Sequence, residues 1–94
     1  MKEDARKKVL ARLRRIEGQV AGIQRMVEED RYCVDILNQV AAVEGALDRV
    51  GHLLLAGHVE TCVTSAIESG RPKERKQKLD ELMDVFSRFG RVRP

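Results

Sequence analysis

The stretch CVDILNQVAAVEGALDRVGHLLLAGHVETCVTSAIES, residues 33–69, decides the fold of this chain. It contains no proline, and its apolar side chains recur in steps of three and four, at Leu37, Val40, Val43, Leu47, Val50 and Leu54. That spacing places them on one face of an α-helix. The stretch therefore predicts one unusually long helix that pairs with other helices. Glycine weakens a helix, so we expect a kink near Gly57.

A second apolar seam runs through residues 5–29. Its members are spaced alternately by four and three residues, at Val9, Leu13, Ile16, Val20, Ile23 and Val27. This repeat is typical of helices that pack side by side, and it predicts a helix over 5–29. Gly18 and Gly22 lie between seam positions and predict a tight crossing with another backbone. Asp30 is expected to be the N-cap of the following helix.

The C-terminal region predicts a third, shorter helix. Residues 69–72 are a turn signal, because glycine commonly ends a helix and proline begins the next. A basic connector over 73–76 should lead into a helix that Gly90 ends. One face of this helix carries Leu79, Leu82, Met83, Phe86 and Phe89. We therefore expect one all-α domain over residues 1–94, whose small core needs support from a metal or from oligomerisation.

Composition narrows the class of protein. No apolar run approaches the roughly 18 residues of a membrane helix, and the start of the chain does not have the pattern of a signal peptide. We therefore expect a cytoplasmic protein without membrane contact, in which Cys33 and Cys62 stay reduced and indicate metal or redox chemistry. Two inert buried thiols are the alternative. No phosphate-binding loop or nucleophile with an acid–base partner is present, so we do not expect an enzyme.

Cys33, His58 and Cys62 are the candidate site. His58 and Cys62 are four residues apart and share one face of a helix. Cys33 falls on nearly the same face as His58 but about 37 Å away, at about 1.5 Å of rise per residue. If the helix is continuous, one chain cannot bring all three side chains to one ion, whereas two antiparallel copies of the long helix can. The spacing therefore predicts a homo-oligomer with two equivalent sites between chains.

The donor atoms of this site favour a soft ion. Two thiolates and one imidazole suit three-coordination, and Cu(I) fits best. Zinc would need a fourth ligand, such as water or Glu60, and nickel or cobalt would prefer more nitrogen and oxygen. One alternative is that the three side chains face a dimer seam without a metal. Another is a redox-sensing thiol activated by Arg31 or His58.

Basic side chains are concentrated at the start of the chain. The first fifteen residues hold seven Lys or Arg against two acids, and the net charge of the chain is +3. A charge run is usually a solvated surface, but arginine also suits bidentate contact with phosphate. The pattern is compatible with a nucleic-acid partner.

Four segments taken together resemble a known family. They are RLRRIEGQV (residues 12–20), Gly22-Ile23, Tyr32-Cys33 and HVETC (residues 58–62). They are similar to the copper-sensitive operon repressor family, also called the CsoR/RcnR family, over nearly the whole chain. The resemblance implies an all-helical repressor whose three-helix subunits form an antiparallel dimer with a four-helix core, usually assembled into a tetramer. Such a protein binds operator DNA when ligand-free and releases it when its effector binds.

The resemblance also implies roles for individual residues. Cys33, His58 and Cys62 match the copper ligands that meet across the dimer, and Tyr32 and Glu81 match groups that couple the ligands to the rest of the protein. The surface expected to contact DNA is formed by Arg12, Arg14, Arg15 and Gln19. Relatives often carry an arginine where this chain has Ala21.

Sister branches of the family differ at positions that can be read in this chain. Nickel and cobalt sensors need a histidine near the N-terminus, which is absent from residues 1–10, and formaldehyde sensors have proline where this chain has Lys2. Persulfide sensors lack the histidine that is His58 here. The resemblance thus implies a Cu(I)-responsive repressor that controls copper efflux or homeostasis genes. The alternatives are a thiol or persulfide sensor and a cytosolic copper-binding protein without a DNA role.

Overall fold

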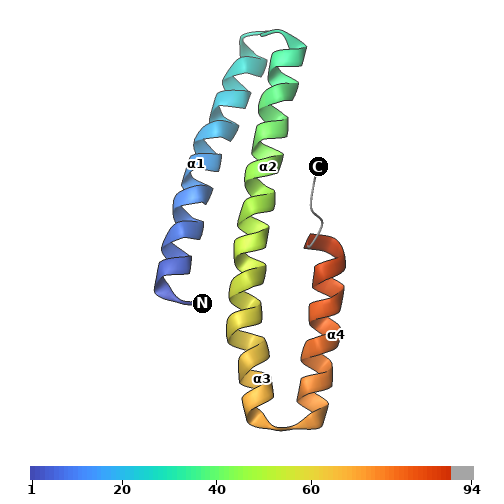
Figure 1. Cartoon of the computed structure of the whole chain (residues 1–94). Coiled ribbons are helices and arrows are strands. Elements are labelled where there is room, and N and C mark those ends of the chain that lie inside the picture. The colour runs from blue at the N-terminus through green and yellow to red at the C-terminus, as the bar shows by residue number, and fades with distance from the viewer. Residues whose placement is uncertain (90–94) are drawn as a thin grey trace.

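Two long antiparallel helices form the first part of the molecule. The structure is a computed structural model that describes residues 1–89, without the side chains of residues 62, 63, 66, 69 and 89. Helix α1 spans Glu3–Glu28 and α2 spans Cys33–His58, and the two lie side by side (Figure 1). The expected helices are confirmed, and no strand occurs in the part of the chain that the structure describes. The Gly90 helix end lies outside the described residues.

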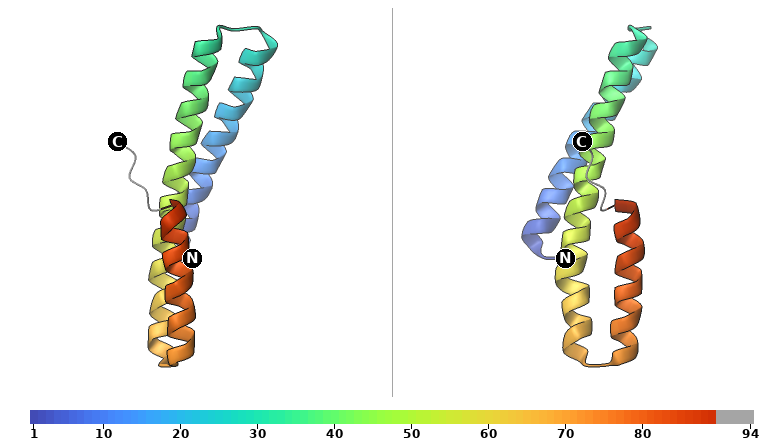
Figure 2. Two further views of the ribbon diagram at one scale, coloured as in Figure 1. Left: turned by 90° about the vertical axis from the view of Figure 1, so that its right-hand side faces the viewer. Right: turned by 45° about the vertical axis from the view of Figure 1, so that its right-hand side comes forward.

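Three further helical segments complete the described part of the chain. The π-helix η1 (Val59–Val63) follows α2 directly, α3 (Thr64–Ser69) continues it, and α4 (Pro72–Phe89) returns antiparallel to it (Figures 1 and 2). The prediction of a connector over 73–76 was wrong, because α4 already begins at Pro72. Proline suits the first turn of a helix, and the Arg75 N–H already donates to the Arg71 carbonyl at 3.0 Å.

The irregularity expected near Gly57 takes the form of the π turn. Thr61 Oγ1 donates to the Gly57 carbonyl at 2.8 Å, inside the region where hydrogen bonding changes from α to π. A threonine that bonds four residues back competes with regular helix bonding. The helical stretch 33–69 therefore changes from α to π at Val59, two residues after Gly57.

Asp30 ends α1 instead of capping α2. Its φ is +51°, and the N–H of Arg31 donates to the Met26 carbonyl at 2.9 Å while that of Asp30 donates to Val27 at 3.2 Å. These two bonds form a Schellman motif with Asp30 at the left-handed position, which aspartate tolerates better than most residues. The N-cap of α2 is Tyr32, without a side-chain cap. The sequence prediction for Asp30 was therefore wrong.

The buried core lies between α1 and α2. Val9, Ile16 and Val50 form it, and Leu13, Val43, Ala46 and Leu53 pack around them. Other members of the apolar seams stay exposed in the single chain: Val20, Val27, Leu37, Leu47, Leu54, Leu79, Met83 and Phe86. A Cβ added at Gly18 or Gly22 would meet no atom within 4 Å, so the expected tight crossing does not occur within one chain. The molecule is elongated, at 58 × 26 × 20 Å.

None of the described helices is both long and apolar enough to cross a membrane.

Candidate functional site

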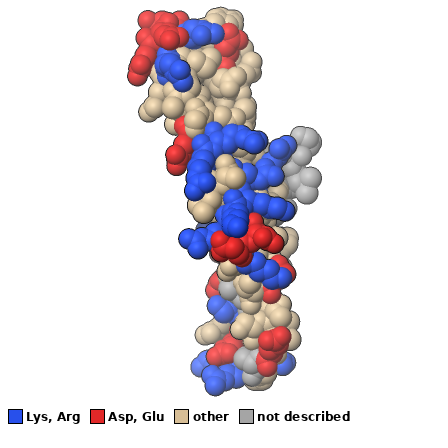
Figure 3. Space-filling model, turned by 90° about the vertical axis from the view of Figure 1, so that its left-hand side faces the viewer, with Lys and Arg blue, Asp and Glu red and all other residues tan. Residues whose placement is uncertain are grey.

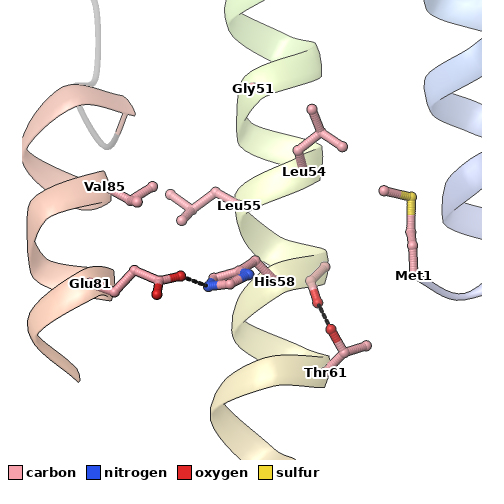
Figure 4. A pocket seen from close by; sticks show the side chains of 9 residues that line it. Met1, Gly51, Leu54, Leu55, His58, Thr61, Glu81 and Val85 are labelled. Atoms are coloured by element: carbon pink, nitrogen blue, oxygen red, sulfur yellow. Dashed lines mark hydrogen bonds and ion pairs between the residues drawn. The ribbon is translucent and has the colours of Figure 1, made fainter. Parts of the chain in front are cut away.

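His58 is held in place by a carboxylate from α4. It is the last residue of α2, and its Nε2 lies 3.2 Å from Glu81 Oε1 (Figure 4). The other carboxylate oxygen of Glu81 lies 3.9 Å from Lys78 Nζ. The His58 side chain is 29% exposed and that of Glu81 50%. Because Glu81 occupies Nε2, the nitrogen left for another partner is Nδ1.

Cys62 follows His58 in η1, and its side chain lies outside those that the structure describes. In an α-helix, a residue four positions further on has turned about 40° past a full circle. The backbone of η1 therefore keeps Cys62 about one helical turn along the chain from His58. A π turn inserted in an α-helix is frequently found at functional sites.

Cys33 lies at the opposite end of α2 from His58. It is the first residue of that helix, it is exposed, and its neighbour Tyr32 is 68% exposed. Because α2 is unbroken between Cys33 and His58, the two residues are about 37 Å apart along its axis. The described side chains accordingly contain no group of three His, Cys, Asp or Glu that could hold a metal. The structure therefore brings Glu81 to His58 but does not bring Cys33 or Tyr32.

An open cavity of about 450 Å³ surrounds the His58 end of α2. Its walls are mostly apolar and come from α2, α4 and the first residue of the chain: Leu54, Leu55, Val85 and Met1 (Figure 4). His58 and Glu81 supply its polar groups on the α4 side. A single chain thus leaves space next to His58 that another molecule could fill.

Glu60, which the sequence suggested as a fourth zinc ligand, is engaged elsewhere. Its carboxylate pairs with the Lys2 ammonium, which precedes α1. The hydrogen bond to Glu60, and then its negative charge, raise the pKa of Lys2 above the usual 10.5. The Glu60 carboxylate is therefore paired with Lys2 instead of being left open for a metal.

A second concave region lies between α1 and α2. This groove has a volume of about 350 Å³ and a floor of small and apolar residues, Ile16, Ala42, Gly45 and Ala46. Arg12, Arg15 and Gln19 line it from α1, and Arg49 lines it from α2. Figure 3 shows Lys and Arg gathered across the middle of the face that includes α1. We call these four lining residues and the floor the arginine groove.

Gln19 contributes an unusual feature of the arginine groove. Its side-chain Oε1 is buried and has no hydrogen-bond partner within the described part of the chain. A buried acceptor without a partner costs free energy, so an incoming donor would be favoured there. Arg14 is exposed on α1 but does not line the groove, because it lies more than half a turn round the helix from Arg12.

Arg49 was missed by the sequence analysis. Its signal was available, since it is the sole Lys or Arg between residues 33 and 58. Only the packing of α1 on α2 shows that Arg49 lies on the side of α2 that faces Arg12 and Arg15.

Comparison with known proteins agrees with this geometry. The sequence model of the family described as metal-sensitive transcriptional repressors matches residues 5–88. This chain belongs to that family. The resemblance expected from the sequence is confirmed. The copper-sensing transcriptional repressor CsoR of Bacillus subtilis is 55% identical over 78 residues, which cover 83% of this chain and 74% of that repressor. The copper-sensing repressor RicR of Mycobacterium tuberculosis is 56% identical over 61 residues, or 65% and 64% of the two chains.

Solved structures of the metal-sensitive repressors have the same fold. The Cu(I)-bound repressor CsoR from Geobacillus thermodenitrificans superimposes with a TM-score of 0.82 at 45% identity, covering 97% of this chain and 92% of that one. The nickel-responsive regulator InrS superimposes with a TM-score of 0.73 at 46% identity, covering 88% and 90%. Overall identity is nearly the same for the Cu(I)-bound repressor and the nickel-responsive regulator, so it does not distinguish between the two metals.

Proposed function

We propose that this chain is a cytoplasmic, Cu(I)-responsive transcriptional repressor. It binds operator DNA when metal-free and leaves it when copper binds, which derepresses copper efflux or homeostasis genes. The observation that carries the proposal is the orientation of His58: Glu81 holds Nε2 at 3.2 Å, which leaves Nδ1 for a metal beside the open cavity. Fixing a ligating histidine through its other nitrogen is typical of metal sites in proteins.

The chemistry of the donors favours copper over nickel. Cys33, His58 and Cys62 offer two thiolates and one imidazole, a soft set that suits three-coordinate Cu(I). Nickel would prefer further nitrogen or oxygen ligands, and the nearest carboxylates are already engaged, Glu81 with His58 and Glu60 with Lys2. Cys33, His58 and Cys62 would hold the ion, and copper would supply a soft Lewis acid that accepts thiolate and imidazole donors.

A second copy of the chain would complete the site. Cys33 is exposed and cannot reach His58 within one chain, while the cavity at His58 is open. Exposed apolar residues on α2, such as Leu37, Leu47 and Leu54, supply the surface for an antiparallel partner. In that homodimer Cys33 of each chain meets His58 and Cys62 of the other, with Tyr32 carried next to the site. A dimer of such dimers is the expected tetramer.

The arginine groove supports the DNA-binding half of the proposal. Arg12, Arg15 and Arg49 converge from two helices, and guanidinium groups suit the bidentate recognition of phosphate. Gln19 lines the same groove, and its unpartnered oxygen becomes available to an incoming donor once the side chain turns outward. Arg14, which points elsewhere on α1, would contact DNA only outside this groove.

Regulation follows from linkage between the two sites. Cys33 and His58 of different chains can approach one metal only if α2 of each chain is fixed relative to the other. Each α2 carries Arg49 and most of the floor of the groove. Bound copper must then lower the affinity for DNA, and bound DNA must lower the affinity for copper by the same factor.

An anaerobic Cu(I) titration with an operator-binding readout tests the proposal. We expect metal-free protein to bind the operator and copper to release it, typically with a coupling of about 1–3 kcal/mol. Equal operator affinity with and without copper would contradict the proposal. Binding to operator DNA through phosphate contacts weakens steeply as the salt concentration rises. A copper carrier without a DNA role would show no such DNA binding.

The exposure of Cys33 also suits a thiol or persulfide sensor. The variant His58→Ala separates the two functions. It should abolish the response to copper but leave a response to oxidant or persulfide, because the two thiols remain.

A further inference from the structure

The segment before α1 is tied to the turn that holds the candidate ligands. The Lys2 ammonium pairs with the carboxylate of Glu60, although the two residues are 58 positions apart in the sequence. Next to this pair, the Met1 side chain reaches the cavity wall, with Cγ 4.0 Å from the position that a Cβ on Gly57 would take. Figure 4 shows Met1 on the opposite side of α2 from Glu81. Both links join the start of α1 to the region around η1.

The two members of this pair occupy informative positions. Lys2 is the N-cap of α1, and its carbonyl accepts the first hydrogen bond of that helix, from the Arg6 N–H at 3.0 Å. Glu60 lies in the π turn, between His58 and Cys62. The pair therefore connects the ligand-bearing turn to the helix that supplies Arg12 and Arg15 to the arginine groove.

We propose that Lys2 and Glu60 form an ionic latch that transmits the state of the ligand-bearing turn to the DNA-binding helix. The inference rests on the proposed function and names a route for its regulation. A change in the path of η1 moves Glu60, which carries Lys2 and the first turn of α1 with it. Because α1 is a continuous helix of 26 residues, a displacement of its first turn shifts or tilts Arg12 and Arg15 relative to Arg49.

The latch should contribute modestly to the coupling between copper binding and operator binding, because both of its side chains are largely exposed, at 68% for Lys2 and 57% for Glu60. Exposed ion pairs have small energies and are screened by salt. We therefore expect the latch to change the factor by which copper weakens operator binding about two- to fivefold, and to do so most at low salt.

Charge reversal tests the latch with a double-mutant cycle. The variants are Lys2→Glu, Glu60→Lys and the double exchange, and the measured quantity is the ratio of operator affinities without and with Cu(I). Each single variant should change this ratio about two- to fivefold, and the double exchange should restore it. The ratio cancels the direct effect of net charge on DNA affinity. Single variants with the ratio of the wild type, or a double exchange that restores nothing, would overturn the latch.

A matched control and a metal-free readout complete the test. Asp84 and Arg88 form an exposed ion pair at 2.8 Å within α4, and exchanging their charges should leave the ratio unchanged. In metal-free protein, Lys2→Glu should speed hydrogen exchange of the Arg6 amide, and the double exchange should slow it again. Exchange that is unchanged in Lys2→Glu would overturn the latch. If copper does not change the operator affinity of the wild type, the proposed function is overturned together with the latch. If copper lowers the operator affinity of the wild type and the single variants keep its affinity ratio, only the latch is overturned.

Discussion

The two helix hairpins that share α2 are built differently. The α1–α2 hairpin has a closed core at Val9, Ile16 and Val50, and beside it the arginine groove. In the hairpin that α2 and η1 form with α4, the described side chains of α4 are all at least partly exposed, and an open cavity lies beside His58 and Glu81. The first hairpin buries a core within one chain, whereas the second leaves a cavity open beside His58.

This difference indicates how binding to DNA and response to a metal are divided. The residues that we propose for DNA contact are positioned by packing within one chain, so their arrangement does not depend on a complete metal site. The proposed metal site lacks Cys33, which lies at the tip of the first hairpin. In the homodimer that we propose, the first hairpin of a second copy would complete the second hairpin of this chain.

The largest expected effect comes from removing Cys33. Cys33→Ala should weaken Cu(I) binding on the order of 100-fold or more, because one of the three proposed copper ligands is lost. Operator binding by the metal-free protein should stay intact. Chelator competition under anaerobic conditions measures the affinity. Full regulation of operator binding by copper in this variant would contradict the proposal that Cys33, at the tip of the first hairpin, is needed for the metal site.

Complementation shows whether the site lies between chains. A heterodimer of Cys33→Ala with His58→Ala keeps one intact site if ligands come from both chains, and none if they come from one. Random pairing of the two variants should therefore restore about one quarter of the wild-type copper sites. The two variants purified separately are the controls, and restoration no greater than theirs would place the ligands in a single chain.

The next effect is expected at Glu81 in the second hairpin. Glu81→Gln should weaken copper binding or its regulation about 10- to 100-fold, because His58 would lose the charged partner of Nε2. The matched control is Asp80→Asn, a neighbouring exposed carboxylate on α4. Both variants are measured by Cu(I) titration with operator binding. Equal behaviour of the two would show that the His58 contact has no role.

Arg49 tests the first hairpin. Arg49→Ala should weaken operator binding on the order of tenfold and lower the slope of log affinity against log salt by about 1, because one phosphate contact is lost. Arg14→Ala is the control, since Arg14 is exposed but does not line the groove. Fluorescence anisotropy at several salt concentrations measures both. A larger loss in Arg14→Ala would place the DNA surface outside the arginine groove.

The smallest effect is expected at the apolar tip of the first hairpin. Leu37 is 61% exposed in the single chain, and a partner should cover it. Leu37→Ala should weaken dimerisation about fivefold, since part of an apolar side chain is no longer buried, whereas Leu37→Met should stay near the wild type. Sedimentation at several protein concentrations measures the dissociation constant. An unchanged constant in Leu37→Ala would remove this residue from the interface.

Local patterns were read correctly from the sequence where the signal was strong. The three-and-four spacing along residues 5–29 and 33–69 predicted two long helices. The π turn that begins at Val59 was not predicted from the sequence, which indicated only a kink near Gly57. Asp30 was misread because aspartate serves both as an N-cap and as a left-handed residue at a helix end. Only the hydrogen bonds of the turn distinguish these two roles.

Sequence alone determined the all-helical fold, the repressor family and the separation of Cys33 from His58, because helical spacing and rise are local properties of the chain. Tertiary structure decided that Glu81 meets His58, that Arg49 joins Arg12 and Arg15, and that Lys2 reaches Glu60. These contacts join residues far apart in the sequence. They depend on how helices rotate and pack against one another, which the period of a single helix does not specify.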